Sequence, residues 1–267
     1  MPQHHLATPD AYFVQDGEDR YVPTRHVQGA WRATEQHVAP LAGLLAHAVE
    51  THNPRPGLQL ARLHYEILGV IALAPTQVRV STIRRGRTIE LVEATASIEG
   101  REVVSARGWR LAAVDTSAVA GTDLPSLPDP QSWPVWDGTQ TWTGGYIGSL
   151  EFRVDPQRRP GQGRMWLRSP IALLDGMPVG PVAAYAMFVD TANGVAVRAD
   201  PTHWAFPNVD LHIDLWREPV PGWVGFDTQV TFGPTGLGLT SSVLHDIEGP
   251  VGRAQQMLTV RPFRDLT

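Results

Sequence analysis

The sequence predicts an α+β protein built from two tandem copies of one unit, each with strands wrapped around a long helix. The segment Leu63–Ile67 recurs as Leu211–Leu215, 148 positions further along, and both segments begin with a Leu-His pair. Each copy begins with a helix-like apolar segment, His37–Thr51 in one and Pro178–Asp190 in the other. Hydrophobic residues make up 42% of the chain and charged residues 18%, which favours a buried core over disorder.

The first copy is predicted to begin with a helix and to continue with four strands. Thr34 is the expected N-cap, and apolar residues cover most of the circumference of His37–Thr51. Asn53–Gly57 ends this helix, and Arg84–Arg87 and Glu99–Arg101 form tight turns between strands. The predicted strands are Leu60–Leu68, Gln77–Arg84, Thr88–Ser97 and Val103–Leu111.

The second copy repeats this order. Its apolar helix is expected at Pro178–Asp190, and Gly233–Gly236 and Glu248–Pro250 mark turns. In its first strand, Asp210 and His212 share one face because side chains alternate along a strand. The predicted strands are Asn208–Arg217, Val224–Phe232, Leu237–His245 and Val251–Val260.

A proline-rich linker joins the copies. The prediction is a first unit at 12–112, a linker with little regular structure at 113–139, and a second unit at 140–262 that carries the site. A long apolar helix wrapped by antiparallel strands is the hotdog arrangement. Two such units side by side predict a double hotdog, with one shared antiparallel sheet wrapping two long helices.

Composition excludes several functions. The net charge of −5 gives no reason to expect nucleic acid as a partner, and the chain has no cysteine for a thiolate nucleophile or a disulfide. Met1–Leu6 is polar and lacks the apolar run of a secretory signal, and Ile171–Val189 is too interrupted to span a membrane. No glycine-rich phosphate loop and no Gly-x-Ser-x-Gly elbow is present. A cytoplasmic protein without a cofactor is therefore expected.

Two parts of the chain resemble a known family. Gly29-Ala30-Trp31, followed by His37 and by Pro40–Ala46, resembles the start of the thioesterase-like double-hotdog proteins. Gly236–Asp246, together with Gly249–Gln256, resembles their carboxy-terminal part, and the whole resemblance runs from about Tyr12 to Arg261. The chain is thus similar to the acyl-CoA thioesterase II family. The resemblance implies hydrolysis of a small-molecule acyl thioester, and an acyl-CoA first of all.

The resemblance also implies site residues. In these enzymes an Asp, a Thr or Ser, and a Gln position and activate a water, and these roles fall on Asp210, Thr231 and Gln256. The start of the first helix, His37-Val38-Ala39, is the expected substrate-binding segment, because its N–H groups can hold an oxyanion. Many relatives carry a Gly-Gly pair here, where this chain has Val38-Ala39-Pro40, and proline has no N–H to donate.

Alternatives remain open. The first-copy counterparts of the three implied catalytic residues are Arg62, Thr82 and about Arg107, so only the second copy is expected to be catalytic. The alternate residues of Asp210-x-His212-x-Asp214 share one strand face and could act as metal ligands. A third or fourth ligand is not evident, and no metal site is expected. The alternative function is a non-hydrolytic hotdog protein that binds or transforms a hydrophobic acyl or polyketide-like ligand. The oligomeric state stays undecided, with a homo-oligomer as one alternative.

Overall fold

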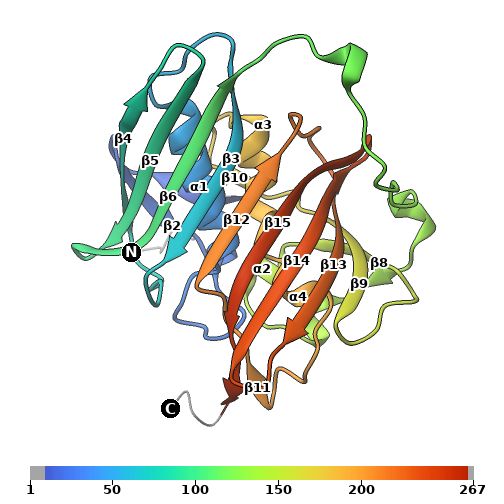
Figure 1. Ribbon diagram of the computed structural model, residues 1–267. Helices are drawn as coiled ribbons and strands as arrows, with labels where there is room; N and C mark the ends of the chain where they lie inside the picture. Colours follow the sequence, from blue (N-terminus) through green and yellow to red (C-terminus); the bar gives the residue numbers. More distant parts are fainter. Residues whose placement is uncertain (1–9, 264–267) are drawn as a thin grey trace.

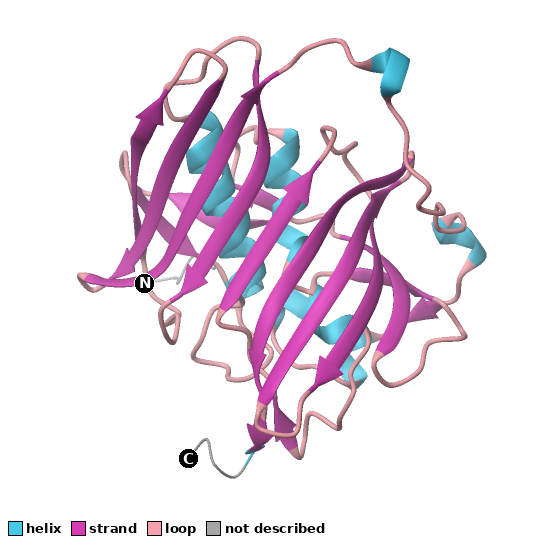
Figure 2. Cartoon of the chain, viewed as in Figure 1, coloured by secondary structure: helices cyan, strands magenta, loops and turns pink. Residues whose placement is uncertain are grey.

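The computed structural model describes residues 10–263, in which one large sheet lies against two long helices (Figures 1 and 2). The segment Met1–Leu6 lies outside the described residues. The strands of the first half are β1 (Ala11–Gln15), β2 (Arg20–Pro23), β3 (Leu58–Ile67), β4 (Thr76–Arg85), β5 (Ile89–Ile98) and β6 (Arg101–Ala112). Those of the second half are β7 (Val135–Trp136), β8 (Glu151–Val154), β9 (Gln162–Arg168), β10 (Ala172–Leu174), β11 (Trp204–Ala205), β12 (Asp210–Leu215), β13 (Val224–Phe232), β14 (Leu237–Asp246), β15 (Gly249–Thr259) and β16 (Arg261–Pro262). The α-helices are α1 (Val38–Thr51), α2 (Gly145–Gly148), α3 (Pro181–Val189) and α4 (Ala192–Val195).

The sheet joins the two copies through one pair of strands. Its order within residues 10–263 is β10-β1-β2-β4-β5-β6-β3-β12-β15-β14-β13-β9-β8-β7. β3 and β12, the strands that hold the repeated sequence, pair antiparallel with His64 opposite His212. The predicted double hotdog with a shared sheet is confirmed.

One pair of strands departs from the expected antiparallel sheet. β10 belongs to the second half of the chain but pairs with β1 of the first half, and this pair is parallel. The other neighbouring strands of the described sheet pair antiparallel. The parallel pair is short and lies at the sheet edge, so it leaves the hotdog core unchanged.

Helices α1 and α3 pack against each other behind the sheet (Figure 1). A Cβ added at Gly43 would lie 2.4 Å from the Cβ of Met187, so the close approach of the helices requires glycine there. Residues 39–49 of α1 are all buried, which explains why the helix is apolar on every side. Thr34 is not the N-cap of α1: the cap is His37, whose side chain accepts a hydrogen bond from the N–H of Ala39.

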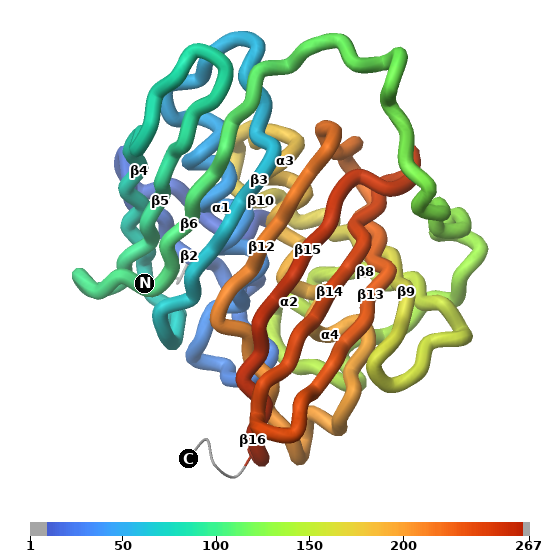
Figure 3. The backbone as a smooth tube through the Cα atoms, viewed as in Figure 1, coloured from blue at the N-terminus to red at the C-terminus, as the bar shows by residue number. Residues whose placement is uncertain are grey.

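The region 113–139 crosses one end of the sheet from β6 to the opposite edge (Figure 3). It contains short 3-10 turns and also β7, which pairs with β8. The indole of Trp166 donates a hydrogen bond to the carbonyl of Pro128 at 2.9 Å. Trp133 is buried against the ring of Trp166. The region therefore packs onto the second unit and supplies its edge strand.

Candidate active site

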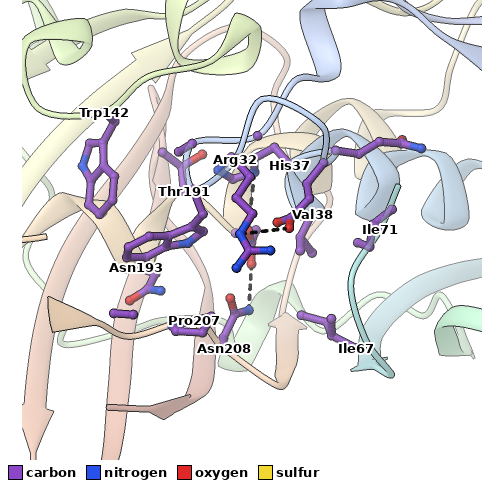
Figure 4. A pocket seen from close by; sticks show the side chains of 18 of the residues that line it. Arg32, His37, Val38, Ile67, Ile71, Trp142, Thr191, Asn193, Pro207 and Asn208 are labelled. Atoms are coloured by element: carbon purple, nitrogen blue, oxygen red, sulfur yellow. Dashed lines mark hydrogen bonds and ion pairs between the residues drawn. The ribbon is translucent and has the colours of Figure 1, made fainter. Parts of the chain in front are cut away.

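A cavity of about 420 Å³ opens where the two units meet. Its walls come from the loop that precedes α1, the ends of β3 and β15, the start of β12, and the segment around α4. Figure 4 shows side chains from these segments facing one space. The lining includes Trp31, Arg32, His37, Val38, Trp136, Trp142, Phe152, Asp190, Gly194 and Asn208.

A buried carboxylate lies in the wall of this cavity. Asp190 is the C-cap of α3 and is 5% exposed. Its Oδ1 accepts hydrogen bonds from Asn208 Nδ2 at 2.8 Å and from Gln256 Nε2 at 2.9 Å. Asn208 precedes β12, and Gln256 lies in β15 on the face that covers the helices. Two separate segments of the second unit thus hold one oxygen of the carboxylate at the end of α3 in place.

The other carboxyl oxygen faces the first unit. Asp190 Oδ2 lies 3.5 Å from His37 Nδ1, at the start of α1. The same Nδ1 accepts the N–H of Ala39 at 3.1 Å, so the ring proton of neutral His37 belongs on Nε2. Burial lowers the pKa of His37 to about 3, so the ring is neutral at physiological pH. The contact is therefore not an ion pair at neutral pH.

The environment makes Asp190 an unusually basic carboxylate. Burial raises its pKa to about 6, and the hydrogen bonds from Asn208 and Gln256 oppose that rise. His37 Nδ1, 3.5 Å from Oδ2, carries a lone pair and not a proton, so it donates no hydrogen bond to the carboxylate. Above pH 6 the group is ionised, but it binds a proton more readily than an ordinary aspartate does.

The first turn of α1 borders the same space. His37 and Val38 line the cavity, while Ala39 is buried behind them. The N–H groups of a first helical turn have no acceptor within the helix. Ala39 gives its N–H to His37, and Pro40 has none, so Val38 carries the N–H of this turn that is best placed for a ligand oxygen.

The structure brings together some of the implied catalytic residues and separates others. Gln256 is fully buried and contacts Asp190. Asp210 and Thr231 lie on the opposite, outer face of the sheet, because their neighbours Leu211 and Val230 point inward. Asp210 Oδ1 there accepts the N–H of Met257 at 2.6 Å. Asp210 and Thr231 thus do not meet Gln256 in this structure.

The outer face of the seam also holds the residues with metal-like alternation. His212 Nδ1 lies 3.1 Å from His64 Nδ1, and each of these rings also contacts a carboxylate, Asp214 or Glu66. Within residues 10–263, no group of three or more His, Asp or Glu side chains is arranged to hold a metal ion. These side chains therefore form hydrogen bonds across the outer face where the two units join.

Two residues of the cavity were missed by sequence reasoning. Asp190 ends the apolar α3 segment, and a single acid at the end of a buried helix was the signal that could have found it. Asn208 sits just before β12, two positions from the predicted Asp210. Asn208 lies outside the regular strand, so the alternation of faces along β12 does not predict the direction of its side chain.

Comparisons with known proteins agree with this architecture. Residues 27–111 match the model of the acyl-CoA thioesterase N-terminal domain, and residues 121–260 match that of the acyl-CoA thioesterase C-terminal domain. A comparison with curated proteins finds no match.

Several solved structures share the fold. A conserved protein of unknown function with a hot dog fold from Alicyclobacillus acidocaldarius is 14% identical, with a TM-score of 0.74 over 97% of this chain and 99% of that one. The acyl-CoA thioesterase II TesB2 from Mycobacterium marinum is 20% identical, with a TM-score of 0.66 over 95% of this chain and 96% of that one. No helix within residues 10–263 is long and apolar enough to cross a membrane. With the two domain models matching in order along the chain, this double-hotdog protein belongs to the acyl-CoA thioesterase family and is a thioester hydrolase.

Proposed function

We propose that the chain hydrolyses an acyl-CoA with a water activated by Asp190. The observation that carries the proposal is the buried Asp190 carboxylate in the cavity wall, with one oxygen held by Asn208 and Gln256 and the other beside the start of α1. A thioester has a good leaving group, so a positioned water and a base are sufficient chemistry.

The proposed reaction uses few groups. Asp190 takes a proton as the water oxygen attacks the thioester carbonyl carbon. The N–H of Val38 and the positive end of the α1 dipole stabilise the oxyanion that forms. The carbon–sulfur bond then breaks, and the proton held by Asp190 passes to the departing thiolate. Asn208 and Gln256 keep the carboxylate oriented throughout.

The proposal reassigns the base that the resemblance implied. A direct test measures free-thiol release from acyl-CoA by the wild type, Asp190→Asn and Asp210→Asn. Asp190→Asn keeps the size of the side chain but removes its basicity, so turnover should fall by about a hundredfold or more. Asp210→Asn is the matched control on the outer face and should stay within about twofold of the wild type.

The opposite result decides for the other assignment. If Asp210→Asn loses turnover while Asp190→Asn keeps it, the base is Asp210, and the cavity wall plays no part in the chemistry. Circular dichroism spectra of both variants exclude a folding defect as the cause. We propose that the reaction takes place in the cytoplasm on free acyl-CoA. The residues of the proposed site all belong to one chain, and this arrangement is compatible with a homo-oligomer.

A second candidate function rests on the start of α1. Ala39 donates its N–H to His37, and Pro40 has no N–H, so few donors remain in this turn to hold an oxyanion. On this alternative the cavity binds or transforms a hydrophobic acyl or polyketide-like ligand without hydrolysis. Calorimetric binding of acyl-CoA with no thiol release from any thioester would favour it.

A further inference from the structure

The inner part of the cavity is bounded mainly by aromatic side chains. We call it the inner chamber and define it by Trp31, Trp136, Trp142, Phe152 and Gly194. Trp31 and Trp142 meet edge to face, with ring centroids 5.1 Å apart. Trp31 lies on the loop before α1, and the other four residues belong to the second half of the chain. A group bound among these residues would meet ring edges and faces.

Two rings of the inner chamber are held by their neighbours. The ring of Trp136 contacts Phe152, with centroids 5.3 Å apart, and the guanidinium of Arg158 lies 4.4 Å from its centroid. Phe152 is 3% exposed, and a Cβ added at Gly138 would lie 2.6 Å from its ring. Phe152 is therefore tightly packed, and the half-buried Trp136 lies between it and Arg158. A long straight chain could pass this wall only by displacing these rings.

A glycine packs closely against one ring of the inner chamber. A Cβ added at Gly194 would lie 3.3 Å from the indole nitrogen of Trp142, which is tighter than ordinary contact. That nitrogen is buried and has no hydrogen-bond partner among the described residues, so a side chain at 194 would press on a ring that is already enclosed. An apolar cavity of about 150 Å³ can hold a benzene ring. The whole cavity of about 420 Å³ therefore has room for a ring and a thioester together.

From these contacts we infer that the inner chamber selects a compact, ring-bearing acyl group, and that the substrates are aryl-alkanoyl thioesters. This inference rests on the proposed function, because it places the acyl group beyond Asp190 and the thiol carrier at the mouth. Offset or edge-to-face contact between aromatic rings is worth about 2- to 10-fold in affinity for each well-placed pair. A flexible straight chain gains no such contact and loses more conformational freedom on binding.

The test compares three thioesters with the same number of acyl carbons: phenylacetyl-CoA, cyclohexylacetyl-CoA and octanoyl-CoA. We expect kcat/KM for phenylacetyl-CoA to exceed that for octanoyl-CoA by about tenfold, with cyclohexylacetyl-CoA between them. Calorimetric binding of the same compounds to Asp190→Asn should give the same order without turnover. Equal or better hydrolysis of octanoyl-CoA overturns the inference and leaves the proposed function standing.

Variants locate the preference in the inner chamber. Trp142→Leu should reduce the ratio of phenylacetyl-CoA to octanoyl-CoA to about one, and Gly194→Ala should lower kcat/KM for phenylacetyl-CoA more than for octanoyl-CoA. Trp109→Leu is the matched control, because Trp109 lies in β6 away from the cavity and should leave the ratio unchanged. An unchanged ratio in both chamber variants, with thermal unfolding like that of the wild type, contradicts the assignment. If no thioester is hydrolysed yet phenylacetyl-CoA binds most tightly, the proposed function fails and the chamber assignment survives.

Discussion

At Asp190 two effects oppose each other, and their balance sets the chemistry. Burial favours the neutral acid, whereas the amides of Asn208 and Gln256 favour the carboxylate. The pKa of about 6 means that burial prevails. A base of this strength is ionised at neutral pH yet takes a proton from water more readily than a solvent-exposed aspartate does.

This balance predicts the pH dependence of catalysis. We expect kcat/KM to rise with pH along an acid limb centred near pH 6, because only ionised Asp190 can accept the proton. His37, with its pKa lowered to about 3, should add no second limb between pH 5 and 8. Initial rates of thiol release across that range measure the profile. A flat profile would exclude Asp190 as the base.

The same residue predicts a conflict between stability and activity. The pKa of Asp190 is higher in the folded protein than the usual 3.8, so the folded state binds the proton more tightly than the unfolded state. The free energy of unfolding that this group contributes therefore falls as the pH rises from about 4 through 6. At pH 8, Asp190→Asn should be more stable than the wild type by on the order of 1–3 kcal/mol while being nearly inactive.

Urea unfolding at pH 8 and at pH 4.5 checks this conflict. The stabilising effect of Asp190→Asn should shrink at the lower pH, where Asp190 in the folded wild type is already protonated. Destabilisation of equal size at both values would show that the lost hydrogen-bond geometry, and not the charge, dominates.

At the scale of elements, the two long helices lie side by side and antiparallel, so the start of each lies beside the end of the other. The first turn of α1 faces the cavity, whereas the first turn of α3 is closed by Glu50 from the last turn of α1. The Glu50 carboxylate accepts the N–H groups of Val182 and Ala183, the latter at 2.9 Å. One helix start is thus open to a ligand, and the other is occupied by the protein's own carboxylate.

We therefore expect Glu50 to act on stability and not on turnover. Glu50→Ala removes the cap from α3 and should lower the free energy of unfolding by about 1 kcal/mol. Glu50→Gln retains an oxygen acceptor and removes a buried charge, whose pKa burial raises to about 6, so its stability at pH 8 should equal or exceed that of the wild type. Urea unfolding at pH 8 gives the stabilities, and thiol release should stay within about twofold of the wild type. A large loss of turnover in Glu50→Gln would mean that this end of the helix pair takes part in the reaction.

Element boundaries were predictable where the strands are long, and less so at the sheet edges. β13 occupies Val224–Phe232 as predicted, because its turn residues and apolar alternation both mark its ends. The short β1, β2 and β8–β10 were missed, because three to seven residues carry too little periodicity. At the site, the resemblance to the thioesterase family implied Gln256, which contacts Asp190. Asp190 itself was not predicted, because the contacts that hold it come from three elements far apart in the sequence.

At the scale of the whole molecule, the proposed catalytic carboxylate and its amide partners all belong to the second unit. Gln256 donates to Asp190 in the second unit, whereas the first-copy arginines Arg62 and Arg107 lie in strands of the shared sheet, with Arg107 paired to Glu93. A hydrogen bond to a charged group contributes about 1.5–3 kcal/mol. The division of labour between the copies is therefore open to direct measurement.

Gln256→Ala should lower kcat by about 10- to 100-fold, because one of the two amides that orient the base is lost. Arg62→Ala and Arg107→Ala should leave kcat within about twofold of the wild type. An increase in KM alone in either arginine variant would indicate contact with an anionic ligand and not a chemical role. Steady-state kinetics on the three variants decides the question, and a loss of kcat in an arginine variant as severe as in Gln256→Ala contradicts a single site.

The seam between β3 and β12 has a further consequence, which concerns inheritance. In a dimer of identical hotdog chains every substitution appears twice, so a change that improves one site must be tolerated at its symmetry mate. Here His64 and His212 still face each other across the seam, but they are encoded separately. Each half can therefore change independently of the other: Asp190 at the end of α3 lies in the cavity wall, whereas Glu50 near the end of α1 caps the start of α3.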